Sequence, residues 1–182
     1  AITPWNFPSN MIIRKISPAI AAGCTVILKP SKETPLSALA LMELFDQAGF
    51  PDGVVNIVLG DSSTIGPILS ESEDVQKITF TGSTGVGQKL NEQAAPTLKN
   101  VSMELGGHAP YIIFPDADIE RAVETLIQTK FINNGQVCTS PNRTFIHKDI
   151  KDEVTNRIVE AIKEVTVGNG LEDPTVGPLI NQ

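Results

Sequence analysis

Cysteine, histidine and long hydrophobic runs are scarce in this sequence. Its 182 residues include two cysteines and two histidines. Two cysteines cannot build a disulfide framework, so we expect reduced thiols and a cytoplasmic location. No apolar run approaches the length of a membrane span, and no basic and then apolar segment opens the chain as a signal peptide would. Neither His108 nor His147 has a partner at metal-ligand spacing, so we predict no metal site.

Positive charge is also in short supply. The 21 acidic residues outnumber the 14 basic ones, which gives a net charge of −7. Nucleic acid and anionic membranes repel an acidic chain, so we expect neither as a main partner. Hydrophobic residues make up 41% of the chain, which is enough for one core or two small ones. The chain opens and stops abruptly, and we expect it to be a central piece of a longer protein.

Short apolar runs alternate with helical patterns in the first part of the chain. The runs indicate buried strands at 25–29, 54–59, 77–81 and 101–105, and the helical patterns span 8–23, 34–49, 64–69 and 82–95. We expect Ser9 to cap the first helix and Pro35 to open the second. This alternation predicts an α/β fold with a doubly wound, Rossmann-like parallel sheet, of which the chain carries a part.

The alternation restarts after Gly106-Gly107. Strands are expected at 110–114 and 144–147, and helices at 119–131, capped by Asp116 or Asp118, and at 149–165. We therefore place a domain boundary at the two glycines. One partial domain then covers 1–105 and a second partial α/β domain covers 106–182.

One cysteine follows a glycine at the end of a long helical pattern, in Phe131-Ile132-Asn133-Asn134-Gly135-Gln136-Val137-Cys138-Thr139. A thiol at such a break is reachable from solvent and close to backbone N–H groups, and both conditions favour the nucleophilic thiolate. The alternative for Cys138 is a small apolar residue in a loop, since free cysteines are usually inert. Cys24 lies in an apolar run, and we predict that it is a core residue.

Two polar stretches follow predicted strands, which is where ligands bind in open α/β sheets. Lys29 ends the first strand and could donate to ribose hydroxyls or a phosphate, although an exposed loop lysine is the alternative. The turn Gly82-Ser83-Thr84-Gly85-Val86-Gly87 lies between a strand and a helix, and its N–H groups could bind a phosphate. Its order differs from the Rossmann glycine motif, and a plain strand–helix turn explains it equally well.

Two further polar residues stand beside apolar or rigid neighbours. Glu104 lies among apolar residues next to Gly106-Gly107 and could act as a general base, with a surface glutamate at a strand end as the alternative. Asn6 lies between Trp5 and Phe7, where a fixed amide could donate to an oxyanion. The alternative for Asn6 is a capping residue.

Five motifs occur in the order found in the NAD(P)-dependent aldehyde dehydrogenase superfamily, and this resemblance covers the whole chain. They are Pro4-Trp5-Asn6-Phe7-Pro8, Lys29-Pro30-Ser31, Phe80-Thr81-Gly82-Ser83, Glu104-Leu105-Gly106-Gly107 and Asn134-Gly135-Gln136-Val137-Cys138. Members of the family are much longer. The resemblance therefore implies that 1–105 is part of a cofactor-binding domain and that 106–182 begins the catalytic domain.

The resemblance implies an enzyme that oxidises an aldehyde to a carboxylic acid and transfers hydride to NAD or NADP. Cys138 would attack the aldehyde carbon, Asn6 and the Cys138 N–H would hold the oxyanion of the thiohemiacetal, and Glu104 would activate the water that hydrolyses the thioester. The residues implied against the cofactor are Trp5, Lys29, Ser31, Lys32, Gly82, Ser83, Val86 and Leu105. We expect the full-length enzyme to be a homo-oligomer and the isolated segment to be inactive.

Within the family the chain is most similar to succinate-semialdehyde dehydrogenases, through residues 8–15 and 21–26. Two arginines commonly grip the substrate carboxylate in that subgroup. Arg14 matches one of them, and Ile132 stands where the second would fall, so one charge-assisted anchor is missing. The expected substrate is succinate semialdehyde or another aldehyde. Lys32 replaces a glutamate with which many NAD-preferring relatives hold the adenosine ribose, which implies that NADP is accepted.

Two other functions stay open at this point. Acyl-transferring aldehyde dehydrogenases share the scaffold, but they often lack the glutamate that stands here as Glu104. A non-catalytic fragment that binds nucleotide or a partner is compatible with the abrupt ends of the chain.

Overall fold

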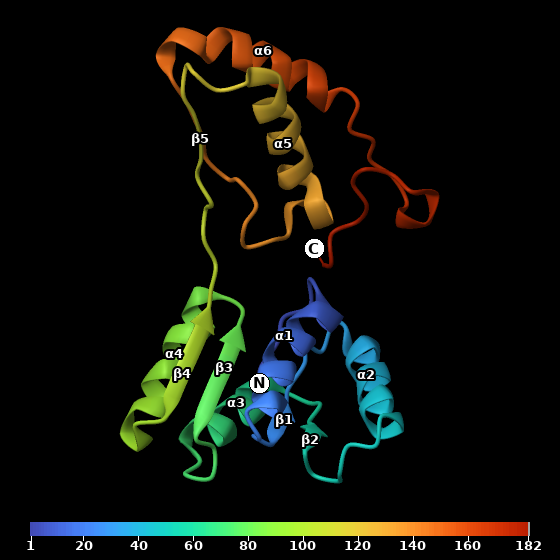
Figure 1. The fold of residues 1–182 in the computed structure, drawn as a ribbon, viewed down its shortest axis with the longest axis vertical. Coiled ribbons are helices and arrows are strands. Elements are labelled where there is room, and N and C mark those ends of the chain that lie inside the picture. The colour runs from blue at the N-terminus through green and yellow to red at the C-terminus, as the bar shows by residue number, and fades with distance from the viewer. Residues whose placement is uncertain (182) are drawn as a thin grey trace. The chain divides into compact units, whose positions relative to one another are not determined.

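The computed structural model describes residues 1–181 and divides into two compact units, Ala1–Gly106 and Gly107–Gln182 (Figure 1). The division falls between Gly106 and Gly107, one residue beyond the boundary expected from the sequence. The cofactor-binding and catalytic roles of the two parts stay predictions. Both units contain parallel strand pairs with helices between the strands, as strand–helix alternation predicts.

The first unit alternates helices and strands from its start to its end. It contains α1 (Pro8–Ala21), β1 (Val26–Leu28), α2 (Pro35–Gln47), β2 (Val55–Ile57), α3 (Ser62–Glu71), β3 (Lys77–Thr81), α4 (Thr84–Ala94), η1 (Ala95–Thr97) and β4 (Asn100–Glu104). β1 pairs in parallel with β2, and β3 pairs in parallel with β4. The bounds of β3 confirm the predicted strand, and α2 begins at Pro35 as expected.

Residues 1–3 join these two strand pairs into one parallel arrangement. The Ile2 N–H donates to the Thr79 carbonyl at 2.9 Å, and the Ile2 carbonyl accepts from the Thr81 N–H at 3.1 Å. On the other side, the Thr3 N–H donates to the Lys29 carbonyl at 3.1 Å, and parallel bridges connect Ile2 with Lys29 and with Phe80. The strand order is therefore β2, β1, residues 1–3, β3, β4. No strand was predicted at residues 1–3, because a segment of three residues before a proline is too short to show the hydrophobic periodicity of a strand.

The helices of the first unit cover opposite faces of this sheet. Successive side chains of a strand point to opposite faces. Ala1 packs against the buried cluster formed with α1 and α2, whereas Ile2 packs against the cluster formed with α4. α3 packs beside α4. α1 and α2 thus lie on one face and α3 and α4 on the other, which confirms the doubly wound α/β fold.

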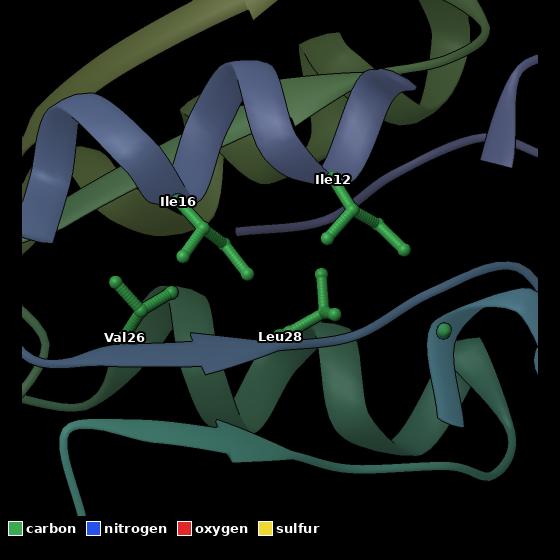
Figure 2. Close-up of a cluster of buried hydrophobic side chains, with 5 residues drawn as sticks. Ile12, Ile16, Val26 and Leu28 are labelled. Atoms are coloured by element: carbon green, nitrogen blue, oxygen red, sulfur yellow. The ribbon is translucent and has the colours of Figure 1, made fainter. Parts of the chain in front are cut away.

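The core between α1 and β1 follows from the 3.6-residue period of the helix and the two-residue period of the strand. Ile12 and Ile16 stand one helical turn apart and are both fully buried. They point toward Val26 and Leu28, which share one face of β1 (Figure 2). Ala38 from α2 completes this buried cluster.

Three local predictions for the first unit were wrong. α1 begins at Pro8 with Phe7 at the N-cap position, so Ser9 lies inside the helix, because proline suits the first helical position. The strands at 25–29 and 54–59 are not buried on both faces, since Ile27 is 41% exposed and Leu59 is 45% exposed. Cys24 is exposed rather than a core residue, because it lies in the turn between α1 and β1.

The second unit is a smaller α/β assembly. It contains β5 (Tyr111–Ile113), α5 (Ile119–Phe131), η2 (Ile132–Gly135), β6 (Thr144–Ile146), η3 (Lys148–Ile150), α6 (Lys151–Ile162) and η4 (Gly170–Glu172). β5 and β6 pair in parallel, and Ile113, Val123 and Val154 form the buried centre. Asp118 caps α5 by accepting from the Arg121 N–H at 3.1 Å, which decides between the two predicted caps. Across residues 1–181, every helix is too short or too polar to cross a membrane.

The core of the first unit yields a stability prediction. Ile12→Ala should lower the free energy of unfolding by about 2–5 kcal/mol, because it empties a fully buried site. The adjacent α1 residue Ile13 is 37% exposed, so Ile13→Ala is a matched control with the same helix propensities and should cost less than about 1 kcal/mol. Urea denaturation of the two variants measures the difference. Equal losses would show that Ile12 does not pack as described.

Candidate active site

The polar residues predicted to contact a cofactor gather at one edge of the first unit's sheet. Its strands are parallel, so their carboxyl ends meet at the same edge. Seven of the predicted residues lie at strand ends or in the loops that follow them, namely Trp5, Lys29, Ser31, Lys32, Gly82, Ser83 and Leu105. Val86 lies in the first turn of α4 and is 49% exposed.

The strand order places a switch point within this edge. The chain leaves residues 1–3 toward α1 on one face, and it leaves the neighbouring strand β3 toward α4 on the opposite face. A crevice forms where adjacent strands diverge in this way. Trp5 and Asn6 therefore lie on one side of the switch point, and Gly82 and Ser83 lie on the other. The fold thus brings two motifs together that are far apart in the sequence.

Lys29 is a buried ammonium at this edge. The residue is only 3% exposed, and its Nζ donates to the Pro30 carbonyl at 3.3 Å. Burial lowers the pKa of Lys29, and the Asp61 carboxylate partly opposes this shift. Nearby, Thr3 is also buried, and its Oγ1 has no hydrogen-bond partner within residues 1–181. Buried polar groups are costly without partners, so this edge is suited to receiving hydroxyl or phosphate groups of a ligand.

The N-terminus of α4 is arranged to accept an anion. Ser83 occupies the N-cap position, yet within the described chain its side chain makes no capping bond to the first turn. The Gly82 N–H donates to the Glu104 carbonyl at 3.0 Å, which ties the turn to the end of β4. A side chain at Gly87 would collide with Leu105, so glycine there lets α4 approach the strand ends closely. The remaining N–H groups and the helix dipole favour a phosphate.

The loop that carries Ser31 and Lys32 leads from β1 to α2. The Ser31 Oγ accepts from the Glu33 N–H at 3.2 Å. The Lys32 Nζ lies 4.0 Å from a Glu33 carboxylate oxygen, and its side chain is 80% exposed. An ion pair at that distance and exposure is weak, so the Lys32 ammonium is available to an incoming anion.

Glu104 ends β4 with an exposed side chain, at the same edge as Asn6. Lys15 of α1 is close enough to interact electrostatically with its carboxylate, and the Lys15 Nζ donates to Thr79 Oγ1 at 3.0 Å. Burial lowers the pKa of Lys15, and Glu104 partly opposes that shift. Lys15 lies in the stretch 8–15 that carries the resemblance to succinate-semialdehyde dehydrogenases, but it was not among the predicted site residues. Arg14, the predicted substrate anchor, is exposed on α1.

Cys138 lies in the second unit and is exposed, as the predicted helix break requires. α5 ends at Phe131, and the turn that follows contains three residues in the left-handed region, Asn133 at φ 48°, Asn134 at φ 59° and Gly135 at φ 74°. A side chain at Gly135 would press against the Lys130 carbonyl. Asparagine and glycine tolerate this conformation better than other residues.

The predicted catalytic residues are divided between the two units. Asn6 and Glu104 belong to the first unit, and Cys138 belongs to the second, together with Ile132, which is 51% exposed. Both thiols are exposed, so exposure alone does not distinguish Cys138 from Cys24. Within residues 1–181 there is no group of three or more His, Cys, Asp or Glu side chains placed to hold a metal ion.

Residues 1–182 match the Aldehyde dehydrogenase family over their whole length. The chain is 53% identical over 182 residues to a mitochondrial succinate-semialdehyde dehydrogenase of Arabidopsis thaliana, with 100% of this chain and 34% of that protein covered. It is 48% identical over 183 positions to an NADP(+) succinate-semialdehyde dehydrogenase of Escherichia coli, with 100% of this chain and 38% of that protein covered.

Solved structures agree with the sequence relatives. The succinate-semialdehyde dehydrogenase of Burkholderia pseudomallei superposes with a TM-score of 0.97 at 48% identity, covering 100% of this chain and 38% of that structure. The chain therefore spans little more than a third of the length of the relatives that it matches. With the doubly wound sheet, the polar strand ends and the exposed cysteine in place, these matches show that the chain belongs to the aldehyde dehydrogenase family.

Proposed function

We propose that the full-length protein oxidises an aldehyde to a carboxylic acid with NAD or NADP as hydride acceptor. One observation carries the proposal: a family match over the whole chain coincides with a sheet edge that gathers Asn6, the buried Lys29 and Glu104. The exposed Cys138 thiol of the second unit supplies the nucleophile. A homo-oligomeric state and a cytoplasmic location stay predictions.

The cofactor is held by the first unit in this proposal. Lys29 would donate to the ribose hydroxyls, which would supply further partners for its buried ammonium. The N-terminus of α4, with Ser83 and Gly82, would hold the pyrophosphate. Trp5, Ser31 and Leu105 line the same edge. When bound, the cofactor accepts a hydride from the substrate carbon.

Cys138 and Asn6 carry out the first half of the reaction. The Cys138 thiolate attacks the aldehyde carbon, so a C–S bond forms and the carbonyl oxygen becomes an oxyanion. The Asn6 amide and the Cys138 N–H donate to that oxyanion, which stabilises the thiohemiacetal. Loss of hydride from this carbon restores the carbonyl and leaves a thioester on Cys138.

Glu104 carries out the second half. Its carboxylate takes a proton from water, and the resulting hydroxide attacks the thioester carbon. The C–S bond then breaks, the carboxylic acid leaves, and Cys138 returns as a thiolate. The Lys15 Nζ, which donates to Thr79 Oγ1 at 3.0 Å, is close enough to interact electrostatically with the Glu104 carboxylate.

The proposed substrate class rests on the names of two relatives and on the charge of the predicted substrate-binding residue. The relatives from Arabidopsis thaliana and Escherichia coli are both named for succinate semialdehyde, which bears a distal carboxylate. We assign Arg14 as the anchor for such a carboxylate, since it is an exposed cation on α1. Ile132 supplies no second cation, so the preference over uncharged aldehydes is weaker than two arginines would give. Succinate semialdehyde is the proposed substrate on this basis.

Glu104→Gln tests the proposed function directly. The full-length variant should lose steady-state turnover but keep a burst of reduced cofactor close to one per active site, because hydride transfer precedes the step that needs the base. Stopped-flow absorbance of the reduced cofactor measures both phases. Cys138→Ser should abolish the burst as well. Turnover by Cys138→Ser would show that the reaction does not require the Cys138 thiol and would contradict the proposed mechanism.

Lys29→Met tests the cofactor site. The substitution removes the buried ammonium but keeps the apolar stem, so the KM for cofactor should rise about 10- to 100-fold, the effect of losing a charged hydrogen bond. The free energy of unfolding without cofactor should stay equal or rise, because the ammonium is poorly paired there. Lys77→Met is the matched control, since Lys77 is exposed at the amino end of β3. A KM that is unchanged in Lys29→Met contradicts the assignment.

Lys32→Glu tests cofactor selection. The exposed Lys32 ammonium should attract the 2′-phosphate of NADP, whereas a carboxylate there would accept bonds from the free ribose hydroxyls of NAD. We therefore expect the parent to use NADP at least as well as NAD, and the variant to shift toward NAD. The ratio of kcat/KM values for the two cofactors is the measurement. Lys77→Glu makes the same charge change at the opposite end of the sheet and should leave the ratio unchanged.

A further inference from the structure

The turn that carries Cys138 is fastened to a segment more than forty residues later in the chain. The Asn134 Oδ1 accepts from the Gly177 N–H at 2.9 Å, and the Asn134 Nδ2 donates to the Pro178 carbonyl at 2.8 Å. One side-chain amide thus pairs with the N–H and the C=O of neighbouring residues, as a backbone peptide would. Figure 1 shows the C-terminal segment returning to the end of α5, where this contact is made.

A second amide reinforces the same contact. The Gln136 Oε1 accepts from the Ile180 N–H at 3.2 Å, and its Nε2 donates to the Asn133 carbonyl at 3.2 Å. The segment 177–180 continues a loop that follows α6, in which the Val176 N–H donates to the Thr166 carbonyl at 2.9 Å. The turn is therefore attached to a segment that is itself hydrogen-bonded across this loop.

The backbone of the turn needs such a support. Asn133 and Asn134 both adopt left-handed conformations, which are uncommon for non-glycine residues, although asparagine tolerates them better than most. Asn134 lies four residues before Cys138, so a change of its backbone angles would displace the thiol. On the other side of Cys138, the buried Ser140 donates its N–H to the Val137 carbonyl at 3.0 Å. The chain is thus held both before and after the cysteine.

We propose that Asn134 is a positioning residue for the reaction: its paired hydrogen bonds to Gly177 and Pro178 hold the turn that presents the Cys138 thiol. This inference rests on the proposed function, in which Cys138 is the nucleophile. It also assigns a role to the segment 177–180, which contacts the turn before Cys138 and so holds the thiol in position. A thiol displaced by about 1 Å would slow attack on the aldehyde about 100-fold while leaving the binding of substrate and cofactor in place.

Two substitutions at Asn134 distinguish the effect of its side-chain hydrogen bonds from the effect of its backbone conformation. Asn134→Gly removes both side-chain bonds, yet glycine adopts the left-handed conformation readily, so the turn itself is not strained. Asn134→Asp keeps an acceptor for the Gly177 N–H and loses the donor to Pro178. Asn156→Ala is the control, because Asn156 is an exposed asparagine on α6 of the same unit.

The measurement is the first-turnover burst of reduced cofactor in the full-length protein, with each variant made in the Glu104→Gln background, where thioester hydrolysis is blocked. Its rate constant reports how well the thiol is placed, and its amplitude reports the fraction of folded sites. Asn134→Gly should lower the rate constant about 10- to 100-fold at full amplitude, with KM values within about twofold of the parent. Asn134→Asp should lie between the parent and the glycine variant, and Asn156→Ala should match the parent.

A glycine variant that loses amplitude but keeps the parent rate constant would overturn the inference, since Asn134 would then only stabilise the fold. If Asn134→Gly does not fold, Asn134→Asp decides: a lowered rate constant at full amplitude supports the positioning role, and an unchanged one overturns it. Cys138→Ser distinguishes the two proposals. If it keeps the burst, the proposed function fails. If it abolishes the burst while both Asn134 variants keep the parent rate constant, only the positioning role fails.

Discussion

The backbone pairing of residues 1–3 is the constraint on which the rest of the first unit depends. These residues hydrogen-bond to β1 on one side and to β3 on the other, so they turn two separate strand pairs into one parallel sheet. Because Ala1 and Ile2 face opposite ways, the same segment contacts both buried clusters. The switch point exists only because this strand lies between β1 and β3. Without it, the segments that carry Asn6 and Ser83 would not follow neighbouring strands of one sheet.

Buried polar groups gather at the edge of that sheet where we propose that the cofactor binds. Lys29 and Thr3 are buried beside the switch point, where a folded chain would ordinarily place apolar residues. Burying an ammonium with a single carbonyl partner costs stability, which the Asp61 carboxylate offsets in part and which the proposed cofactor would offset further. The cost is tolerable because α1, α2 and β1 supply a compact apolar cluster nearby. The apolar residues that stabilise the first unit are therefore different from the polar residues that we propose bind the cofactor.

The second unit, in contrast, holds the Cys138 thiol at its surface. A helix end alone would leave Cys138 on a loose loop. The left-handed turn of Asn133, Asn134 and Gly135 is compact, and two side-chain amides tie it to the segment 177–180. Local strain is therefore balanced by long-range hydrogen bonds. Such an arrangement suits a nucleophile that must be both exposed and fixed.

Periodicity in the sequence determined much of the fold, because helices and strands are set by neighbouring residues: the predicted bounds of β3 and α5 are confirmed, as is the doubly wound α/β class. The tertiary structure decided what local patterns do not encode. It placed residues 1–3 as a central strand, set Lys15 near Glu104, and joined Asn134 to Gly177. Each of these depends on segments distant in sequence, and hydrogen bonds between such segments form only when the whole unit packs.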